Sequence, residues 1–176
     1  MEYMNGPAPG WEARTDSFAP MAGPELVLLL GGNTGDPAME LDRAEVLVGE
    51  RVGEVVARSR DHWTEPWGFS DPRLFLNRAL IVETVKPPRD ALDECLAIEW
   101  LLGRVRPTDG APVSRNIDID ILLIGDQVIE LPGLVVPHPR LHLRRFALAP
   151  LADILPLWHH PKLDATALQL LNGLPA

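Results

Sequence analysis

The sequence is poor in cysteine, because Cys95 is the only one among 176 residues. A single cysteine excludes an intrachain disulfide, so we expect a protein of a reducing compartment, the cytoplasm. Cys95 lies in an apolar segment with helical spacing and has neither a CxxC motif nor an obvious histidine partner. These features favour a buried structural thiol over a catalytic nucleophile.

Long apolar runs are also lacking. No run approaches the roughly 20 residues of a membrane-spanning helix, so we predict no association with a membrane. Residues 1–24 lack the basic start and apolar core of a signal peptide and are rich in glycine, proline and polar residues. This composition is typical of a flexible leader. The remaining residues, 25–176, suffice for one domain with a sizeable core.

Positive charge is in deficit, since the formal net charge is −9. Such a charge disfavours binding to nucleic acid or to an anionic membrane, so we expect small-molecule partners. Arginines nevertheless gather in one lysine-free stretch: Arg104, Arg106, Arg115, Arg140, Arg144 and Arg145. Arginine pairs bidentately with phosphate oxygens, so this cluster predicts an anion site. Arginines that cover helix faces and cap carbonyls are an equal alternative.

The apolar pattern predicts an alternation of short strands and helices. Strands are expected at 25–30, 52–60, 75–84 and 116–124, and amphipathic helices at 38–48 and 91–102. Segments 61–73 and 103–114 are expected to form no regular element. A shorter strand, a Pro-His-Pro corner and helices near 149–154 and 165–171 complete the chain. The order β-α-β-β-α-β predicts an α+β, ferredoxin-like fold, with a four-stranded antiparallel sheet, two helices on one face and a small C-terminal α/β extension.

The sharpest local signal is the carboxylate pair Asp118 and Asp120. Residues i and i+2 of a strand point to the same face, so the two carboxylates project together. Side by side they repel each other and resist burial, and a cation such as Mg²⁺ removes both penalties. The alternative is that the aspartates simply face water while the intervening isoleucines form the core.

A second signal is the number of aromatic residues around the 61–73 segment. Trp63, Trp67, Phe69 and Phe75 supply flat faces for a heteroaromatic ligand, and Asn77 supplies an amide that donates and accepts in one plane. The alternative is that these rings pack in the core under a long loop.

Two further motifs carry weaker signals. Gly31-Gly32-Asn33 resembles neither a Walker motif nor GxGxxG, so it predicts a tight turn and excludes the P-loop and Rossmann folds. The segment Pro137-His138-Pro139 holds His138 rigidly, as a hydrogen bond to phosphate or ribose requires, although a purely structural corner is nearly as plausible. His159-His160 is expected at the surface.

Taken together, five stretches resemble the 6-hydroxymethyl-7,8-dihydropterin pyrophosphokinase family of folate biosynthesis. They are LLLGGNTGD, TEPWGFSDPRLFLNRALIVET, IEWLLGRVR, RNIDIDILLIGDQVI and VVPHPRLHLRRFALAPLADILP. They occur in the order of the family and cover nearly all of residues 25–157. No single stretch decides the resemblance, but the ordered set is highly specific.

The resemblance implies an ATP-dependent transferase that moves pyrophosphate to the hydroxymethyl group of a reduced pterin, releases AMP and acts as a monomer. Asp118 and Asp120 match the positions that hold two Mg²⁺ ions on the triphosphate. Positions of the pterin pocket match Thr64, Glu65, Trp67, Phe75, Asn77 and Phe146. Positions for ATP or phosphate charge match Glu99, Arg104, Arg115, His138 and Arg144. The implied catalytic set is Arg104, Arg115, Asp118 and Asp120.

The sequence departs from the family pattern in one loop. Family members commonly carry Trp-Gly-Pro directly before the arginine that precedes the carboxylate pair, whereas Pro107–Ser114 has no tryptophan and no basic side chain. Gly32 and Glu65 also stand where serine and proline are usual. Because this loop is expected to close over both substrates, two alternatives stay open: a different acceptor, or a pterin- or nucleotide-binding module without catalysis.

Overall fold

The computed structural model describes residues 25–108 and 110–175, so the predicted leader lies outside the described residues. The main sheet is formed by β1 (Glu25–Gly32), β2 (Glu54–Arg58), β3 (His62–Thr64), β4 (Phe75–Glu83) and β5 (Asp118–Ile124). A separate hairpin consists of β6 (Ile129–Leu131) and β7 (Leu134–Val136). The helices are α1 (Pro37–Arg51), α2 (Pro88–Leu101), α3 (Arg145–Ile154) and α4 (Ala167–Asn172), with a 3₁₀ turn at Leu141–Leu143.

The strand order confirms the ferredoxin-like prediction. The sheet runs β2-β4-β1-β5, and every neighbouring pair is antiparallel. The central strand β1 pairs with both β4 and β5, so Gly31 lies opposite Asn77 on one side and Asp118 on the other. The register of β1 therefore brings residues of β4 and β5 that are distant in sequence to the same end of the sheet.

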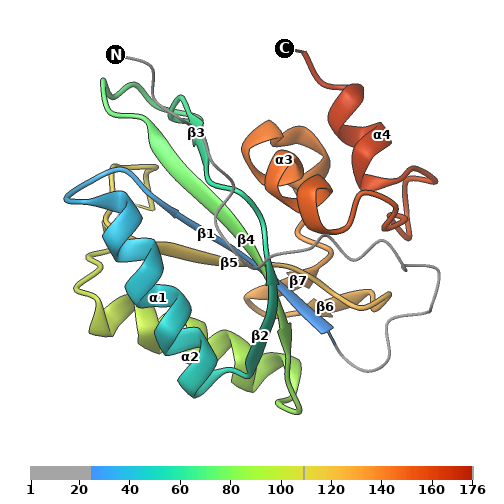
Figure 1. The fold of residues 1–176 in the computed structure, drawn as a ribbon, viewed down its shortest axis with the longest axis horizontal. Helices are drawn as coiled ribbons and strands as arrows, with labels where there is room; N and C mark the ends of the chain where they lie inside the picture. Colours follow the sequence, from blue (N-terminus) through green and yellow to red (C-terminus); the bar gives the residue numbers. More distant parts are fainter. Residues whose placement is uncertain (1–24, 109, 176) are drawn as a thin grey trace.

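The sheet has two different faces because successive side chains of a strand alternate. Leu26, Leu28 and Leu30 pack with buried residues of α1 and α2, among them Cys95, whose predicted burial is confirmed. On the opposite face, Val27 and Leu29 belong to a second core with residues of α3 and α4. Figure 1 shows α1 and α2 on one side of the sheet and α3 and α4 on the other. The C-terminal extension thus covers part of the face that a minimal ferredoxin-like fold leaves open.

Helix α1 begins where the turn chemistry predicts. The Asp36 side chain accepts a hydrogen bond from the backbone N–H of Met39 (3.2 Å), and Pro37 occupies the first turn. Helix α3, by contrast, begins at Arg145 rather than near residue 149. Pro150 lies inside it despite the backbone hydrogen bond that a proline removes, and its side chain is buried with Ala147, Leu148 and Leu151 of the same helix.

Two predictions about the sheet were wrong. Residues 61–73 are not wholly irregular, since β3 pairs with Phe75–Asn77 of β4. Strand β2 ends at Arg58, opposite Leu80. The edge of β4 at Phe75–Asn77 is therefore free to pair with His62–Thr64. Gly31 and Gly32 likewise do not form a tight turn, because β1 continues through both.

The C-terminal part also differs in detail. Two strands, β6 and β7, follow β5 where one shorter strand was predicted. His160 is buried, with its ring 5.4 Å from that of Trp158 and edge-on to it, whereas His159 is exposed as predicted. No helix of the described residues is long and apolar enough to cross a bilayer.

Candidate functional site

A cavity of about 400 Å³ opens on the α3 side of the sheet, where β1 ends and its antiparallel neighbours β4 and β5 begin. The alternation of β4 and β5 directs Phe75, Asn77, Asp118 and Asp120 into it. Its remaining lining residues are Leu29, Gly31, Thr64, Glu65, Trp67, Phe69, Arg104, Arg106, Pro107, Gly110, Ala111, Pro112, Arg115, His138, Arg140, Arg144 and Phe146. The structure thus brings together the site residues implied by the family resemblance, except Glu99.

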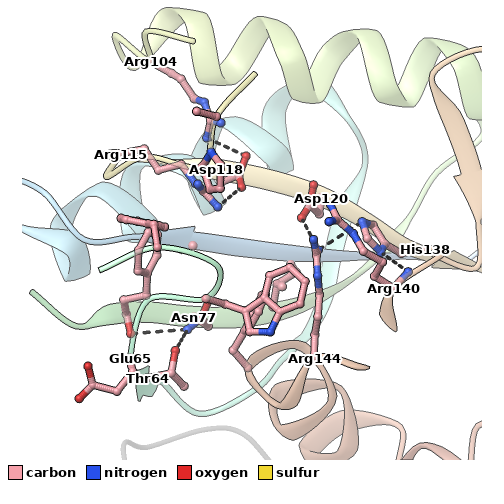
Figure 2. Close-up of a pocket in the computed structure, with 18 of the residues that line it drawn as sticks. Thr64, Glu65, Asn77, Arg104, Arg115, Asp118, Asp120, His138, Arg140 and Arg144 are labelled. Atoms are coloured by element: carbon pink, nitrogen blue, oxygen red, sulfur yellow. Dashed lines mark hydrogen bonds and ion pairs between the residues drawn. The ribbon is translucent and has the colours of Figure 1, made fainter. Parts of the chain in front are cut away.

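The two aspartates of β5 have different partners (Figure 2). Asp118 accepts a hydrogen bond from Arg104 Nη1 (2.6 Å) and forms an ion pair with Arg115 Nη2 (2.7 Å). Asp120 has one weaker partner, Arg144 Nη1 at 3.7 Å, and its side chain is 36% exposed. Asp118 is therefore neutralised by arginines, and Asp120 is the more available of the two carboxylates.

The surroundings of Asp120 suit a cation. Burial in the cavity, with repulsion from Asp118, raises the pKa of Asp120 to about 6. Within the described residues, no three His, Cys, Asp or Glu side chains converge as a complete metal site. Two carboxylates that face one cavity therefore fit hard cations such as Mg²⁺, whose remaining ligands come from phosphate oxygens and water.

Glu99 lies behind the cavity rather than in it. This carboxylate of α2 is 2% exposed and accepts a hydrogen bond from the backbone N–H of Ile119 (2.8 Å). Its other oxygen binds Arg106 and lies 3.7 Å from Arg104 Nε. Burial and the nearby Asp118 raise the pKa of Glu99. Glu99 therefore orients arginines and the β5 backbone from the far side of the sheet.

The other half of the cavity is aromatic. Asn77 donates from Nδ2 to Thr64 Oγ1 (3.0 Å), which fixes the amide plane. A Cβ atom on Gly31 would lie 3.2 Å from Asn77 Oδ1, so glycine leaves room for this amide. Phe69 meets Phe75 edge-on with ring centres 6.0 Å apart. The result is a slot with flat walls and one fixed amide.

Trp67 joins the aromatic and the charged halves. The Arg144 guanidinium lies 4.8 Å from the centre of its ring, and the Arg140 guanidinium lies 5.4 Å away. Phe146 packs against Trp67 with ring centres 6.2 Å apart. Trp63 does not contribute to the cavity, because the next residue of a strand faces the other way and its side chain is 54% exposed. The prediction of Trp63 as a stacking face was therefore wrong.

His138 is held at the cavity wall by backbone contacts. Its N–H donates to Leu122 O (2.8 Å), and its Nδ1 accepts from the N–H of Arg140 (3.2 Å). Burial, reinforced by Arg144 and Arg140, lowers the pKa of His138 to about 4. The ring is therefore neutral near pH 7, and its Nε2 lies 3.3 Å from a guanidinium nitrogen of Arg144.

Several lining residues lie outside the set implied by the family resemblance: Phe69, Arg106 and Arg140, and also Leu29, Gly31, Pro107, Gly110, Ala111 and Pro112. The signal was present, since both arginines belong to the lysine-free cluster and Phe69 to the aromatic segment. Sequence spacing alone did not show which arginines face inward. The departure at Gly32 has a local reason, because a Cβ there would lie 2.2 Å from the carbonyl oxygen of Asn116.

The comparisons with known proteins agree with this geometry. Residues 27–156 match the family described as 7,8-dihydro-6-hydroxymethylpterin-pyrophosphokinase (HPPK). The chain belongs to the HPPK family. Members of this family are ATP-dependent diphosphotransferases, so the match also gives the class of enzyme.

Several relatives are named 2-amino-4-hydroxy-6-hydroxymethyldihydropteridine pyrophosphokinase. The protein of Porphyromonas gingivalis is 40% identical over 78% of this chain and 94% of its own. That of Methylorubrum extorquens is 43% identical over 72% of this chain and 80% of its own. The crystal structure of Plasmodium falciparum HPPK-DHPS with pteroate has a TM-score of 0.69 at 18% identity. It covers 85% of this chain, but this HPPK-family chain spans only 44% of the Plasmodium chain, so that similarity concerns the fold.

Proposed function

We propose that this HPPK-family protein transfers the pyrophosphoryl group of ATP to 6-hydroxymethyl-7,8-dihydropterin and releases AMP. The observation that carries the proposal is one cavity that joins an aromatic slot to a carboxylate pair ringed by arginines. The names of relatives about 40% identical support this acceptor over the two alternatives left open by the loop sequence.

The pterin occupies the aromatic half. Its flat ring stacks on Phe75 and Phe146, with Trp67 beside them, and Asn77 reads the edge of the ring. The hydrogen bond from Asn77 Nδ2 to Thr64 Oγ1 leaves Oδ1 as the free acceptor, which matches the N–H groups of a pterin edge. Glu65, an exposed residue at the mouth, lies beside the same slot.

The triphosphate of ATP occupies the charged half. Within the described chain, the Nε atoms of Arg115 and Arg144 are buried without a hydrogen-bond partner. Buried donors of this kind are stabilised by an anion that satisfies them. The neutral ring of His138, with Nε2 3.3 Å from Arg144, holds that arginine beside the phosphates without adding charge. Glu99 holds the Arg104 and Arg106 side chains toward this anion from behind.

Asp118 and Asp120 hold two Mg²⁺ ions in this proposal. The fit rests on their shared face, on the single distant partner of Asp120 and on its raised pKa. When held by these carboxylates, Mg²⁺ would supply charge neutralisation and orientation of the triphosphate.

The transfer itself is a displacement at phosphorus. The hydroxymethyl oxygen attacks the β-phosphorus, a new P–O bond forms, and the bond from that phosphorus to the oxygen of AMP breaks. The hydroxyl proton is lost as the new bond forms. The protein contributes chiefly position and charge: the slot fixes the acceptor, and the arginines hold the phosphates in line with it.

The test measures AMP formed from ATP and 6-hydroxymethyl-7,8-dihydropterin, with and without Mg²⁺. We expect Mg²⁺-dependent AMP from the wild type, none from Asp120→Ala, and unchanged activity from Asp126→Asn, an exposed turn aspartate that serves as the matched control. Absence of AMP at high protein concentration, with pterin still bound, would overturn the proposal.

We also propose that the protein acts as a monomer in the cytoplasm, without nucleic acid or membrane. The net charge of −9 and the single buried cysteine support this setting.

A further inference from the structure

A cluster of polar side chains ties the two loops that flank the cavity. The β3–β4 loop, residues 65–74, supplies Asp71, and the α2–β5 loop, residues 102–117, supplies Ser114. Ser114 Oγ donates to Asp71 Oδ2 (2.6 Å) and accepts from Asn33 Nδ2 (3.1 Å). Two loops that lie 43 positions apart in sequence therefore meet at one hydroxyl.

Asp71 is oriented by its own loop. The backbone N–H of Arg73 donates to Asp71 Oδ1 (2.8 Å), and the Arg73 guanidinium binds both carboxylate oxygens at 2.9 and 2.7 Å. Hydrogen bonds from Arg73 and Ser114 hold the pKa of Asp71 well below its usual range. Asp71 is thus an ionised acceptor at neutral pH, and a hydroxyl donor to an ionised acceptor makes a strong hydrogen bond.

Asn33 connects this cluster to Arg115, the residue that follows Ser114 in the chain. It is 3% exposed, its Oδ1 accepts from the N–H of Arg115 (3.0 Å), and its own N–H donates to Arg115 O (2.8 Å). The backbone of Arg115 is therefore held on both sides, directly beside Ser114. Neither Asn33, Asp71 nor Ser114 lines the cavity, so none of them is placed to touch a substrate.

Arg115 is the residue that this cluster delivers to the cavity. Its guanidinium nitrogen Nη2 lies 2.7 Å from Asp118 Oδ2, and the centre of the guanidinium lies 5.1 Å from the centre of the Phe75 ring. Arg115 thus spans from the aromatic slot to the carboxylate pair. A small displacement of its backbone would move the guanidinium relative to both.

We propose that Ser114 and Asp71 are positioning residues that hold Arg115 and residues 110–114 of the α2–β5 loop in the geometry of pyrophosphoryl transfer. This inference rests on the proposed function. Residues 107–114 have no tryptophan and no basic side chain that could anchor the loop. The hydrogen bond between Ser114 and Asp71 anchors it instead. Because the contact lies outside the cavity, it acts on the transfer step more than on substrate affinity.

The test compares Ser114→Thr with Ser114→Val. These side chains have nearly the same shape and differ in the hydroxyl, so only the threonine keeps the donor. We expect Ser114→Val to lower kcat about tenfold, which corresponds to one lost charge-assisted hydrogen bond. KM for the pterin and for ATP should change less than about twofold, and Ser114→Thr should restore most of kcat. Ser70→Ala, in the same loop as Asp71, is the control expected to leave kcat unchanged.

A double-variant cycle tests the pairing itself. If Asp71 and Ser114 act through their mutual bond, Asp71→Asn combined with Ser114→Val should be barely slower than Ser114→Val alone. Amide hydrogen exchange of residues 107–114 provides a readout independent of activity, and we expect faster exchange in Ser114→Val but not in Ser114→Thr.

The outcomes separate the two proposals. Wild-type kcat in Ser114→Val, additive effects in the cycle, or an equal loss in Ser114→Thr and Ser114→Val would each overturn the positioning role. A wild-type protein that forms no AMP would overturn the proposed function. In that case hydrogen exchange alone tests whether the Ser114–Asp71 bond anchors the loop. Equal exchange rates in wild type and Ser114→Val would overturn that anchoring as well.

Discussion

Asp118 and Asp120 face the same cavity from β5, yet only Asp118 is closely paired with arginines. Two guanidinium groups lie 2.6 and 2.7 Å from Asp118, whereas the nearest to Asp120 is 3.7 Å away. Binding of a triphosphate with Mg²⁺ would therefore exchange partners: cations take over the carboxylates, and the released arginines bind phosphate. The unliganded site already contains groups of both signs, and this explains how an acidic protein keeps so many arginines together.

Replacing Asp120 by asparagine should stabilise the protein in the absence of metal. The substitution removes repulsion from Asp118 and the burial of a charge, the two causes that raise the pKa of Asp120. Thermal unfolding should show a higher midpoint than wild type without ligand. Mg²⁺ with a non-hydrolysable ATP analogue should raise the wild-type midpoint much more than that of the variant. Equal stabilisation of both would contradict a metal-binding role for Asp120.

Asp118→Ala should lower turnover by about two to three orders of magnitude. Pterin affinity, measured by fluorescence titration, should stay within about twofold, because Asp118 contacts arginines rather than the aromatic slot. A parallel loss of pterin binding would show that the two halves of the cavity are assigned wrongly.

Thr64→Val should weaken pterin binding about tenfold, the usual effect of one lost hydrogen bond to a buried group. The valine removes the nearest acceptor of Asn77 Nδ2, at 3.0 Å, and leaves only the longer bonds to His62 O (3.4 Å) and Phe75 O (3.5 Å), so the amide plane is held less firmly. Thr64→Ser keeps the hydroxyl and should bind normally. Isothermal titration with pterin and, separately, with an ATP analogue should show an effect on the pterin alone.

Arg78→Met should destabilise the fold by about 1–2 kcal/mol, because it removes charge-assisted hydrogen bonds to three carboxylates that are themselves 21% to 64% exposed to water. The Arg78 side chain is 4% exposed and binds Asp61, Asp42 and Glu45 at 2.7 to 2.9 Å. Urea unfolding measures the change. Arg58→Gln, which loses only a 3.6 Å surface pair with Glu45, should cost less than about 1 kcal/mol. Similar midpoints for the two variants would argue against the importance of the Arg78 cluster.

The hydrogen bonds that Asp153 accepts should make the free energy of unfolding depend on pH. Burial opposes ionisation of Asp153, but hydrogen bonds from Arg60 and His62 outweigh it and lower the pKa. A carboxyl with a lowered folded-state pKa stabilises the protein above its unfolded pKa of about 4, and this contribution is lost as the pH falls through the folded pKa. At pH 7, Asp153→Asn should therefore be about 1 kcal/mol less stable than wild type in chemical unfolding. The gap should narrow below about pH 4, and a gap that stays constant with pH would refute the linkage.

The elements that the sequence predicted well are those with a local cause. The period of two placed Asp118 and Asp120 on one face of β5, and Phe75 and Asn77 on one face of β4, before any tertiary contact was known. The structure brings both pairs to the same cavity. The Asp36–Pro37 start of α1 and the burial of Cys95 followed equally from neighbouring residues.

The errors concern contacts between distant segments. β3 exists because β2 ends early and leaves an edge of β4 free, and this cannot be read from residues 62–64. Its pairing in turn directs Trp63 outward. His160 is buried because the C-terminal segment folds back on Trp158.

The sequence by itself determined the β-α-β-β-α-β order along the chain, the carboxylate pair and the family, because alternation and short motifs are properties of neighbouring residues. Only the tertiary structure decided that Glu99 acts from behind the sheet, that Arg106 and Arg140 face the cavity, and that Ser114 meets Asp71. The physical reason is that a loop side chain acquires its partner only when the register of β1 with β4 and β5 brings the strand ends together.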